Sequence, residues 1–202
     1  LRYPELRGLP LVIGGGSASR PTLRADGTHA FARLRDYHGR GVITTSTYEA
    51  RAFGVFSAMG MMKAARLAPD AVLLPCDFDE YRRCSRLFKA AVRALTPVVE
   101  DRGIDEIYID LSDVPGAREG GGRAIGLALK QAVREATGLS CSVGIAPNKL
   151  LAKLCSEFDK PNGLTLLTQA DVATRVWPLP ARRINGIGPK ASEKLASFGL
   201  HT

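Results

Sequence analysis

The chain has 202 residues, enough for one large domain or two smaller domains with separate hydrophobic cores. Hydrophobic residues make up 45% of the chain and charged residues 24%, as in an ordinary globular protein. No apolar run or signal peptide indicates a membrane-spanning or secreted protein, so we expect a cytoplasmic one. The net charge of +8 favours a polyanionic partner: nucleic acid, nucleotide phosphates or an anionic membrane surface.

The four cysteines, Cys76, Cys84, Cys141 and Cys155, form no C-x-x-C pair and have no histidine at metal-ligand spacing. They lie in apolar or helical contexts, where a cysteine is usually a small reduced core residue. We therefore expect four reduced thiols.

The first third of the chain begins with the apolar run Leu9–Ile13, which predicts a short buried strand. It runs into three glycines, but no Gly-Lys-Ser/Thr follows them, so a phosphate loop is not favoured. The polar stretch 14–40 has weak periodicity, and we expect a long loop or insertion there. Gly41–Thr45 predicts the next strand.

Two helices and a strand are expected next. Ser46 and Glu49 have the spacing of a capping box, which predicts that a helix begins after Ser46. Ser57 can cap a second helix that ends at Leu67, before a proline. Ala71–Leu74 predicts another buried strand.

The rest of the chain predicts a mixed α+β layer. The expected elements are a helix from Asp77 to about Leu95, a hairpin over Val98–Leu111, a helix ending at Gly138 after the glycine-rich loop 116–122, a strand at Cys141–Ile145, a helix from Asn148 to about Phe158 and a strand at Leu164–Leu167. This order gives most of a split βαβ, ferredoxin-like sheet with helices on one face, lacking only a first strand. From Thr168 the pattern turns helical and basic.

Two adjacent carboxylates, Asp105 and Glu106, lie at the start of an apolar strand, after a tight turn expected at 101–103. Neighbouring strand residues point to opposite faces, so both can serve one site only where the strand is just beginning. Carboxylates held together repel unless a cation lies between them, and hard oxygen ligands favour Mg²⁺ or Mn²⁺. The alternative is an exposed acidic hairpin end.

A second set of side chains suits phosphate. Tyr48 and Arg51 are three residues apart and share a helix face, where a hydroxyl and a guanidinium can bind an anion. Lys160 follows another helix, and it can bind phosphate or simply offset the negative end of the helix dipole. Tyr48 and Arg51 can equally be ordinary surface residues.

The segment Ile184–Leu195 has the pattern of a helix-hairpin-helix. Gly186 and Gly188 allow backbone N–H groups to approach a DNA phosphate, and Lys190 and Lys194 supply positive charge. The alternative is an ordinary turn between helices.

Five motifs occur along the chain in this order: Tyr48-Glu-Ala-Arg51, Asp105-Glu106 ahead of Tyr108-x-Asp110, Ser142-Val-Gly-Ile-Ala-Pro-Asn-Lys149, Asp159-Lys-Pro161 and the Ile184–Leu195 hairpin. Together they resemble the Y-family (translesion) DNA polymerases, and among these the bacterial DinB branch most closely. The resemblance covers most of the chain.

The resemblance implies template-directed addition of deoxynucleotides to a primer 3′-hydroxyl by a two-metal mechanism. It implies fingers over residues 1–75, a palm over 76–167 and part of a thumb over 168–202. Asp105 and Glu106 would bind two Mg²⁺ ions, for which Mn²⁺ can substitute. Tyr48, Arg51 and Lys160, with Thr45 as a helper, would hold the deoxynucleoside triphosphate. Gly186, Gly188, Lys190 and Lys194 would hold primer–template DNA, and no membrane is involved.

The chain also departs from the family pattern. A third metal carboxylate, on an Asp-x-Asp strand with the aromatic residue that excludes ribonucleotides, is expected before Leu1. The little-finger domain, through which a sliding clamp is expected to bind, is missing after Thr202, and the stretch 14–40 is long. The polymerase activity is therefore expected of the parent protein. The alternatives are a non-enzymatic DNA-binding fragment or inactive homologue and, among enzymes, a nucleotidyl cyclase, which has no use for the hairpin.

Overall fold

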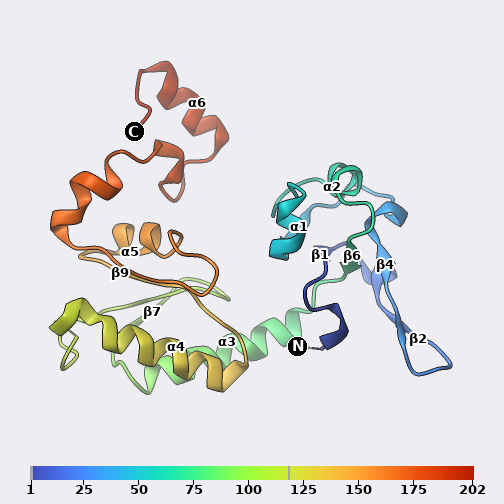
Figure 1. Ribbon diagram of the computed structural model, residues 1–202, viewed down its shortest axis with the longest axis horizontal. Coiled ribbons are helices and arrows are strands. Elements are labelled where there is room, and N and C mark those ends of the chain that lie inside the picture. The colour runs from blue at the N-terminus through green and yellow to red at the C-terminus, as the bar shows by residue number, and fades with distance from the viewer. Residues whose placement is uncertain (1, 118) are drawn as a thin grey trace. The chain divides into compact units, whose positions relative to one another are not determined.

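The computed structural model describes residues 2–117 and 119–202. The chain divides into two compact units, Leu1–Asp79 and Glu80–Thr202 (Figure 1). The assignment of fingers, palm and thumb to these segments stays a prediction. No helix in the described ranges is both long enough and apolar enough to cross a membrane.

The first unit is built on a mixed four-stranded sheet in the order β4-β6-β1-β5. Its strands are β1 (Leu11–Gly14), β4 (Ala32–Arg33), β5 (Ile43–Ser46) and β6 (Val72–Leu74). Strand β1 pairs antiparallel with β5 and parallel with β6. All three residues of β6 are buried, because the strand has neighbours on both edges and is covered on both faces. The strands predicted at Leu9–Ile13, Gly41–Thr45 and Ala71–Leu74 are confirmed within two residues.

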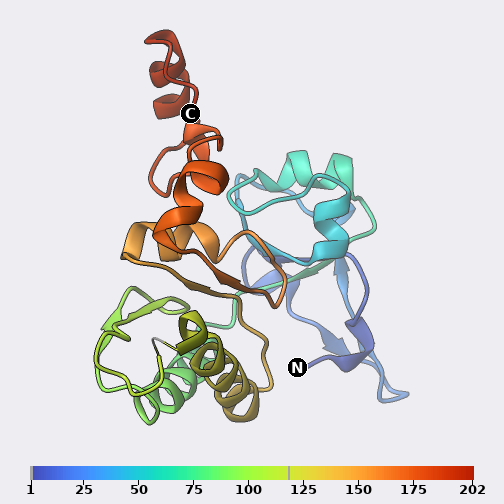
Figure 2. The ribbon, with the colours of Figure 1, turned by 60° about the vertical axis from the view of Figure 1, so that its left-hand side comes forward.

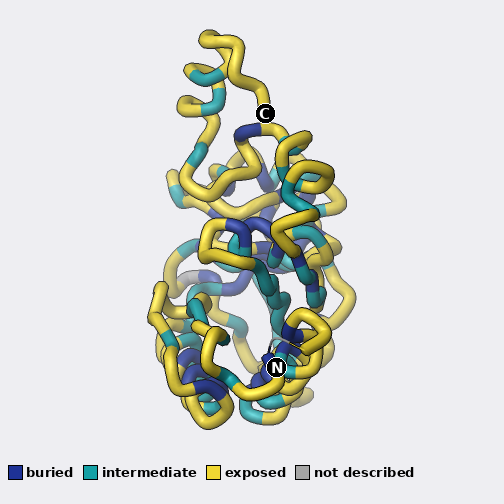
Figure 3. Tube along the Cα trace, turned by 90° about the vertical axis from the view of Figure 1, so that its left-hand side faces the viewer, coloured by how far each residue is buried: buried dark blue, intermediate teal, exposed yellow. Residues whose placement is uncertain are grey.

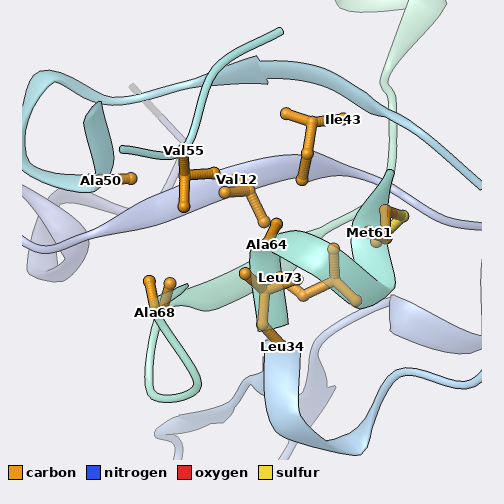
Figure 4. Packing of buried hydrophobic residues seen from close by; sticks show 10 residues of the cluster. Val12, Leu34, Ile43, Ala50, Val55, Met61, Ala64, Ala68 and Leu73 are labelled. Atoms are coloured by element: carbon orange, nitrogen blue, oxygen red, sulfur yellow. The ribbon is translucent and has the colours of Figure 1, made fainter. Parts of the chain in front are cut away.

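The core of the first unit lies between this sheet and the short helices α1 (Tyr48–Ala52) and α2 (Met61–Leu67). Val12 of β1 is fully buried, and the core side chains surround it (Figure 4). The buried members of this cluster are Val12, Leu34, Ile43, Ala50, Val55, Met61, Ala64, Ala68, Ala71 and Leu73.

The stretch 14–40 is not the long loop that its sequence predicts. It contains the two-stranded hairpin β2 (Thr22–Leu23) and β3 (His29–Ala30), and β4 adds an edge strand to the main sheet. Leu34, in the turn after β4, is fully buried, which stabilises the unit by roughly 1.5–3 kcal/mol. Strands of two residues have no periodicity to read, and tertiary pairing alone defines them.

The helix starts in the first unit also differ from the predicted ones. Thr47 caps α1, because its Oγ1 accepts a hydrogen bond from the N–H of Ala50. Ser46 ends β5 instead, and its hydroxyl donates to the carbonyl of Val55. Helix α2 begins at Met61 rather than after Ser57, with Gly60 at its N-cap. A hydroxyl can satisfy a loop carbonyl, here that of Val55 after α1, as well as a helix N-terminus, so sequence spacing alone does not decide.

The second unit is an α+β assembly, and its strands form two separate pairs. Strands β7 (Val99–Asp101) and β8 (Ile107–Ile109) are antiparallel, whereas β9 (Val143–Ile145) and β10 (Leu164–Leu166) are parallel. The mixed α+β class is therefore confirmed. Among the described residues, the strands of this layer form two ladders, β7 with β8 and β9 with β10.

Three helices cover these ladders. Helices α3 (Phe78–Arg93) and α4 (Arg123–Thr137) pack on β7 and β8 through Val92, Leu129 and Val133 (Figure 1). Helix α5 (Lys149–Cys155) lies along β9 and β10 (Figure 2).

Local signals set the ends of two of these helices as expected. Gly138 ends α4 in a left-handed conformation, with a φ of 72°. Asn148 caps α5 by accepting a hydrogen bond from the N–H of Leu151.

The cysteines lie in the described ranges, and all four are free thiols. Cys155, the last residue of α5, is fully buried, and burial raises the pKa of its thiol to about 11. The other three are partly buried. The expectation of reduced thiols is confirmed, and that of core packing holds fully for Cys155.

The C-terminal segment is a series of short turns followed by one regular helix. The turns are Gln169–Asp171, a π-helical turn at Val172–Val176 and Ala181–Arg183, and the helix is α6 (Pro189–Ser197). Helix α6 has no buried residue, and Figure 3 shows this part of the chain mostly exposed, with some intermediate residues. The remaining short turns of the chain are Pro4–Leu6, Ser17–Ser19, Leu34–Asp36 and Glu119–Gly122.

Candidate active site and nucleic-acid interface

Asp105 and Glu106 lie in the loop between β7 and β8, immediately before β8 begins. The N–H of Arg102 donates to the carbonyl of Glu106 at 3.1 Å, so residues 102–106 form the connection and Asp101 still belongs to β7. The tight turn predicted at 101–103 is therefore wrong, since the loop is longer. Both carboxylates are exposed.

Lys89 of α3 fixes the start of this loop. Its ammonium lies 2.8 Å from each carboxylate oxygen of Asp101 and donates to the carbonyl of Gly103 at 2.5 Å. The hydrogen bond from Lys89 keeps the pKa of Asp101 below its ordinary value of 3.8. The Lys89 side chain is only 11% exposed, so a mainly buried cation holds the base of the acidic loop. Sequence reasoning missed this residue, because a helical lysine has no motif of its own.

Glu106 forms an ion pair with Lys153 of α5. Burial lowers the pKa of the Lys153 ammonium, but the hydrogen bond and charge of Glu106 outweigh it, so the net shift is upward. Lys153 also lies 3.6 Å from Glu157, and Glu157 accepts a hydrogen bond from Lys160 at 2.7 Å. Lys153 and Glu157 were not among the predicted site residues. The i, i+4 and i, i+3 spacings of this row were the only available signal.

The acidic pair fits a hard divalent cation as a partial ligand set. Asp105 and Glu106 offer adjacent, exposed carboxylates, and Mg²⁺ commonly takes one or two carboxylates and completes its shell with water and phosphate oxygens. Among the residues that the structure describes, no three His, Cys, Asp or Glu side chains are grouped so that they could hold a metal ion. In the described ranges, no third His, Cys, Asp or Glu joins Asp105 and Glu106 in such a group, and their role as metal ligands stays a prediction.

Tyr48 and Arg51 meet on one face of α1 in the first unit. The Arg51 guanidinium lies over the Tyr48 ring at 5.0 Å from its centroid, and its Nε donates to the carbonyl of Ser46 at 3.3 Å. The Tyr48 side chain is exposed, and so is Thr45 on β5. Helix α1 has only five residues, so an anion here would be bound mainly by the side chains rather than by the helix dipole.

Lys160 lies in a loop that is fastened from α4. The Lys130 ammonium donates to the carbonyls of Cys141, Asn162 and Gly163 and to the Asn162 side chain, at 2.6 to 3.1 Å. The Thr165 hydroxyl donates to Asp159 at 2.6 Å and so ties the start of this loop to β10. Lys130 is a second lysine that the sequence did not single out.

The glycine hairpin after the Ala181–Arg183 turn leads directly into α6. Gly186 has a φ of 94°, a left-handed conformation that favours glycine. Gly188 has an ordinary φ of −79°, and a Cβ there would meet no atom of the chain within 4 Å. Lys190 and Lys194 are exposed on α6. The first arm of the predicted helix-hairpin-helix is thus only a single turn.

Comparisons with known proteins bear on this arrangement. The family model described as impB/mucB/samB matches residues 1–157. DNA polymerase IV of Alkalilimnicola ehrlichii is 38% identical over 199 residues, covering 98% of this chain and 50% of that protein. DNA polymerase IV of Methanoculleus marisnigri is 39% identical, covering 100% of this chain and 51% of that protein.

The chain also matches solved structures of DNA polymerases. The chain matches DinB from Sulfolobus solfataricus with a TM-score of 0.79 and an insertion ternary complex of Dbh DNA polymerase with a TM-score of 0.80. Both are 27% identical, and each match covers all of this chain and 53% or 54% of the other. The chain spans about half the length of the curated relatives it matches. The chain therefore belongs to the impB/mucB/samB family, in agreement with the Y-family resemblance of its motifs.

Proposed function

We propose that the full-length protein is a template-directed DNA polymerase of the translesion type, which adds deoxynucleotides to a primer 3′-hydroxyl. The observation that carries the proposal is the adjacent, exposed pair Asp105 and Glu106 at the start of β8, in a chain whose whole length matches DNA polymerase structures. The fingers, palm and thumb are proposed as residues 1–75, 76–167 and 168–202.

In this proposal Asp105 and Glu106 hold Mg²⁺, or Mn²⁺ in its place, and two ions are expected. When bound, such ions lower the pKa of the primer hydroxyl and neutralise charge on the departing pyrophosphate. The two carboxylates would fix the position of the reaction in the loop immediately before β8.

Tyr48, Arg51 and Lys160 are proposed to bind the triphosphate, with Thr45 as a helper. A guanidinium held by a ring and a carbonyl is preorganised for two phosphate oxygens, because little side-chain freedom remains to be lost. Lys160 would supply a point charge from its fastened loop.

The C-terminal hairpin is proposed to bind duplex DNA through its phosphates. Gly186 and Gly188 expose backbone N–H groups, and Lys190 and Lys194 add charge that requires no base sequence. A sliding clamp is proposed as a further partner from the resemblance alone, and a cytoplasmic location is also proposed.

Primer extension by the full-length protein tests the proposal. With a recessed primer–template and four deoxynucleoside triphosphates, we expect extension that follows the template and stops when EDTA is added. DNA binding without any extension, in Mg²⁺ and in Mn²⁺, would instead favour a non-enzymatic DNA-binding protein.

A further inference from the structure

Four charged side chains of alternating sign form a row in the second unit. The row runs from Glu106 through Lys153 and Glu157 to Lys160. Both lysines share one oxygen, Oε1 of Glu157, at 3.6 Å from Lys153 and 2.7 Å from Lys160. The row therefore joins a proposed metal ligand at one end to a proposed triphosphate ligand at the other.

We propose that Lys153 and Glu157 are positioning residues that couple cation binding at Glu106 to the release of Lys160 for phosphate. The inference rests on the proposed function for the roles of the two end residues. The two middle residues have no role in the set derived from the motifs.

The coupling follows from competition for shared partners. A divalent cation at Glu106 competes with the Lys153 ammonium for the carboxylate and repels it, so Lys153 moves toward its other partner, Glu157. Glu157, better neutralised by Lys153, then holds Lys160 less strongly, and Lys160 can turn to a phosphate oxygen. Linked equilibria are reciprocal, so phosphate at Lys160 favours the cation at Glu106 by the same factor.

Lys153 is the most shielded side chain of the row. Lys153 is 20% exposed, whereas Lys149, one turn earlier on α5, is 62% exposed. Charges that are partly shielded from water are screened less by salt. Lys149 pairs with Glu100 outside the row, so it is a matched control on the same helix.

Binding of Mn²⁺ to the full-length protein, without DNA or nucleotide, tests the first half of the proposal. Electron paramagnetic resonance measures the free ion directly. Lys153→Met removes the competing cation, and we expect about tenfold tighter Mn²⁺ binding. Glu157→Gln leaves Glu106 as the only partner of Lys153 in the row. Lys153 then competes more strongly with the cation, so we expect weaker Mn²⁺ binding. Lys153→Arg and Lys149→Met are expected to match the wild type.

Steady-state nucleotide insertion tests the second half. Lys153→Met leaves Glu157 with Lys160 alone, so the apparent KM for nucleotide should rise. Glu157→Gln should lower that KM, and the double variant Lys153→Met/Glu157→Gln should also have the lowered KM, because Lys153 acts on Lys160 only through Glu157. A purely structural ion pair would not give opposite shifts of cation and nucleotide affinity in the two single variants.

The proposal is overturned if Lys153→Met changes neither Mn²⁺ affinity nor KM, or if the double variant keeps the raised KM of Lys153→Met. If Lys153→Met fails to fold, judged by thermal melting, Glu157→Gln alone decides: unchanged Mn²⁺ affinity or an unchanged or raised KM overturns it. Failure of the proposed function is a separate result, because the wild type would then extend no primer, whereas the Mn²⁺ measurement uses neither DNA nor nucleotide.

Discussion

At the scale of single residues, Arg51 is held in place by two uncharged groups. Its guanidinium is held between the Tyr48 ring and the Ser46 carbonyl, yet neither partner carries a charge. The positive charge is therefore not neutralised by these contacts and stays available to a phosphate.

We predict that Arg51→Ala in the full-length protein mainly raises the apparent KM for nucleotide. The loss of a charge-assisted phosphate contact corresponds to about 1.5–3 kcal/mol. Arg66→Ala, which removes an exposed arginine from α2 in the same unit, is the control and should leave KM unchanged. A defect of Arg51→Ala confined to DNA affinity would assign Arg51 to the template instead.

The acidic pair itself could be predicted from sequence, but its supports could not. The motif places Asp105 and Glu106 before the strand, as the structure has them. Lys89, Lys130 and Lys153 hold the site from helices distant in sequence, and any helical lysine has the same local pattern.

At the scale of elements, the β7–β8 hairpin depends on the contact between Asp101 and Lys89. The lowered pKa of Asp101 means that the ionised carboxylate stabilises the fold above its ordinary pKa of 3.8. That contribution is lost as the pH falls from about this value through the lowered pKa of the folded state. The stability of the hairpin should therefore decrease in acid.

We predict that Asp101→Asn lowers the free energy of unfolding at pH 6 and has progressively less effect below pH ~4. Denaturant unfolding at a series of pH values measures the difference from the wild type. Asp113→Asn, a change of an exposed carboxylate downstream, should show a small difference with no such trend. A constant Asp101→Asn effect down to pH ~2 would contradict the assignment of this pair.

In the hairpin before α6, the backbone conformation requires glycine at one position, Gly186, but not at the other, Gly188. Gly186 requires glycine for its backbone conformation, whereas Gly188 has an ordinary φ and open space around it. Gly188 is also the N-cap of α6, where alanine costs about 1 kcal/mol at most relative to glycine. Nothing in the described part of the chain therefore requires glycine at 188.

We predict that Gly188→Ala changes the melting temperature little but clearly weakens binding to duplex DNA. An added methyl group would block the approach of a phosphate to the backbone N–H groups. Gly16→Ala, at another open position, is the control and should leave DNA binding unchanged. Unchanged DNA affinity of Gly188→Ala would remove this hairpin from the interface.

The elements show where sequence patterns hold and where they fail. Gly138 and Asn148 end and begin helices as predicted, because each signal is satisfied locally by one hydrogen bond. The residues 14–40 were expected to form a loop, because β4 is defined only by pairing with β6, forty residues away. Local signals therefore predicted local structure. The edge strand β4 could not be predicted in this way, because only its pairing with β6 in the folded chain defines it.

At the scale of the whole molecule, the net charge of +8 predicts DNA binding through contacts with the phosphates. Contacts to phosphates release counterions, so affinity should fall with salt by a log–log slope of about −0.9 per contact and should not depend on sequence. We predict that Lys190→Ala makes this slope shallower by about one unit. Fluorescence anisotropy of labelled duplex at several salt concentrations measures it. An unchanged slope would place Lys190 away from the DNA.

The central claim, that Asp105 and Glu106 hold the catalytic cation, is tested most directly by primer extension with full-length Asp105→Ala. Extension should collapse, while DNA binding in the same preparation is retained or slightly stronger, since a charge that repels phosphate is gone. Asp113→Ala should extend primers like the wild type. Extension by Asp105→Ala at a rate near that of the wild type would contradict the account.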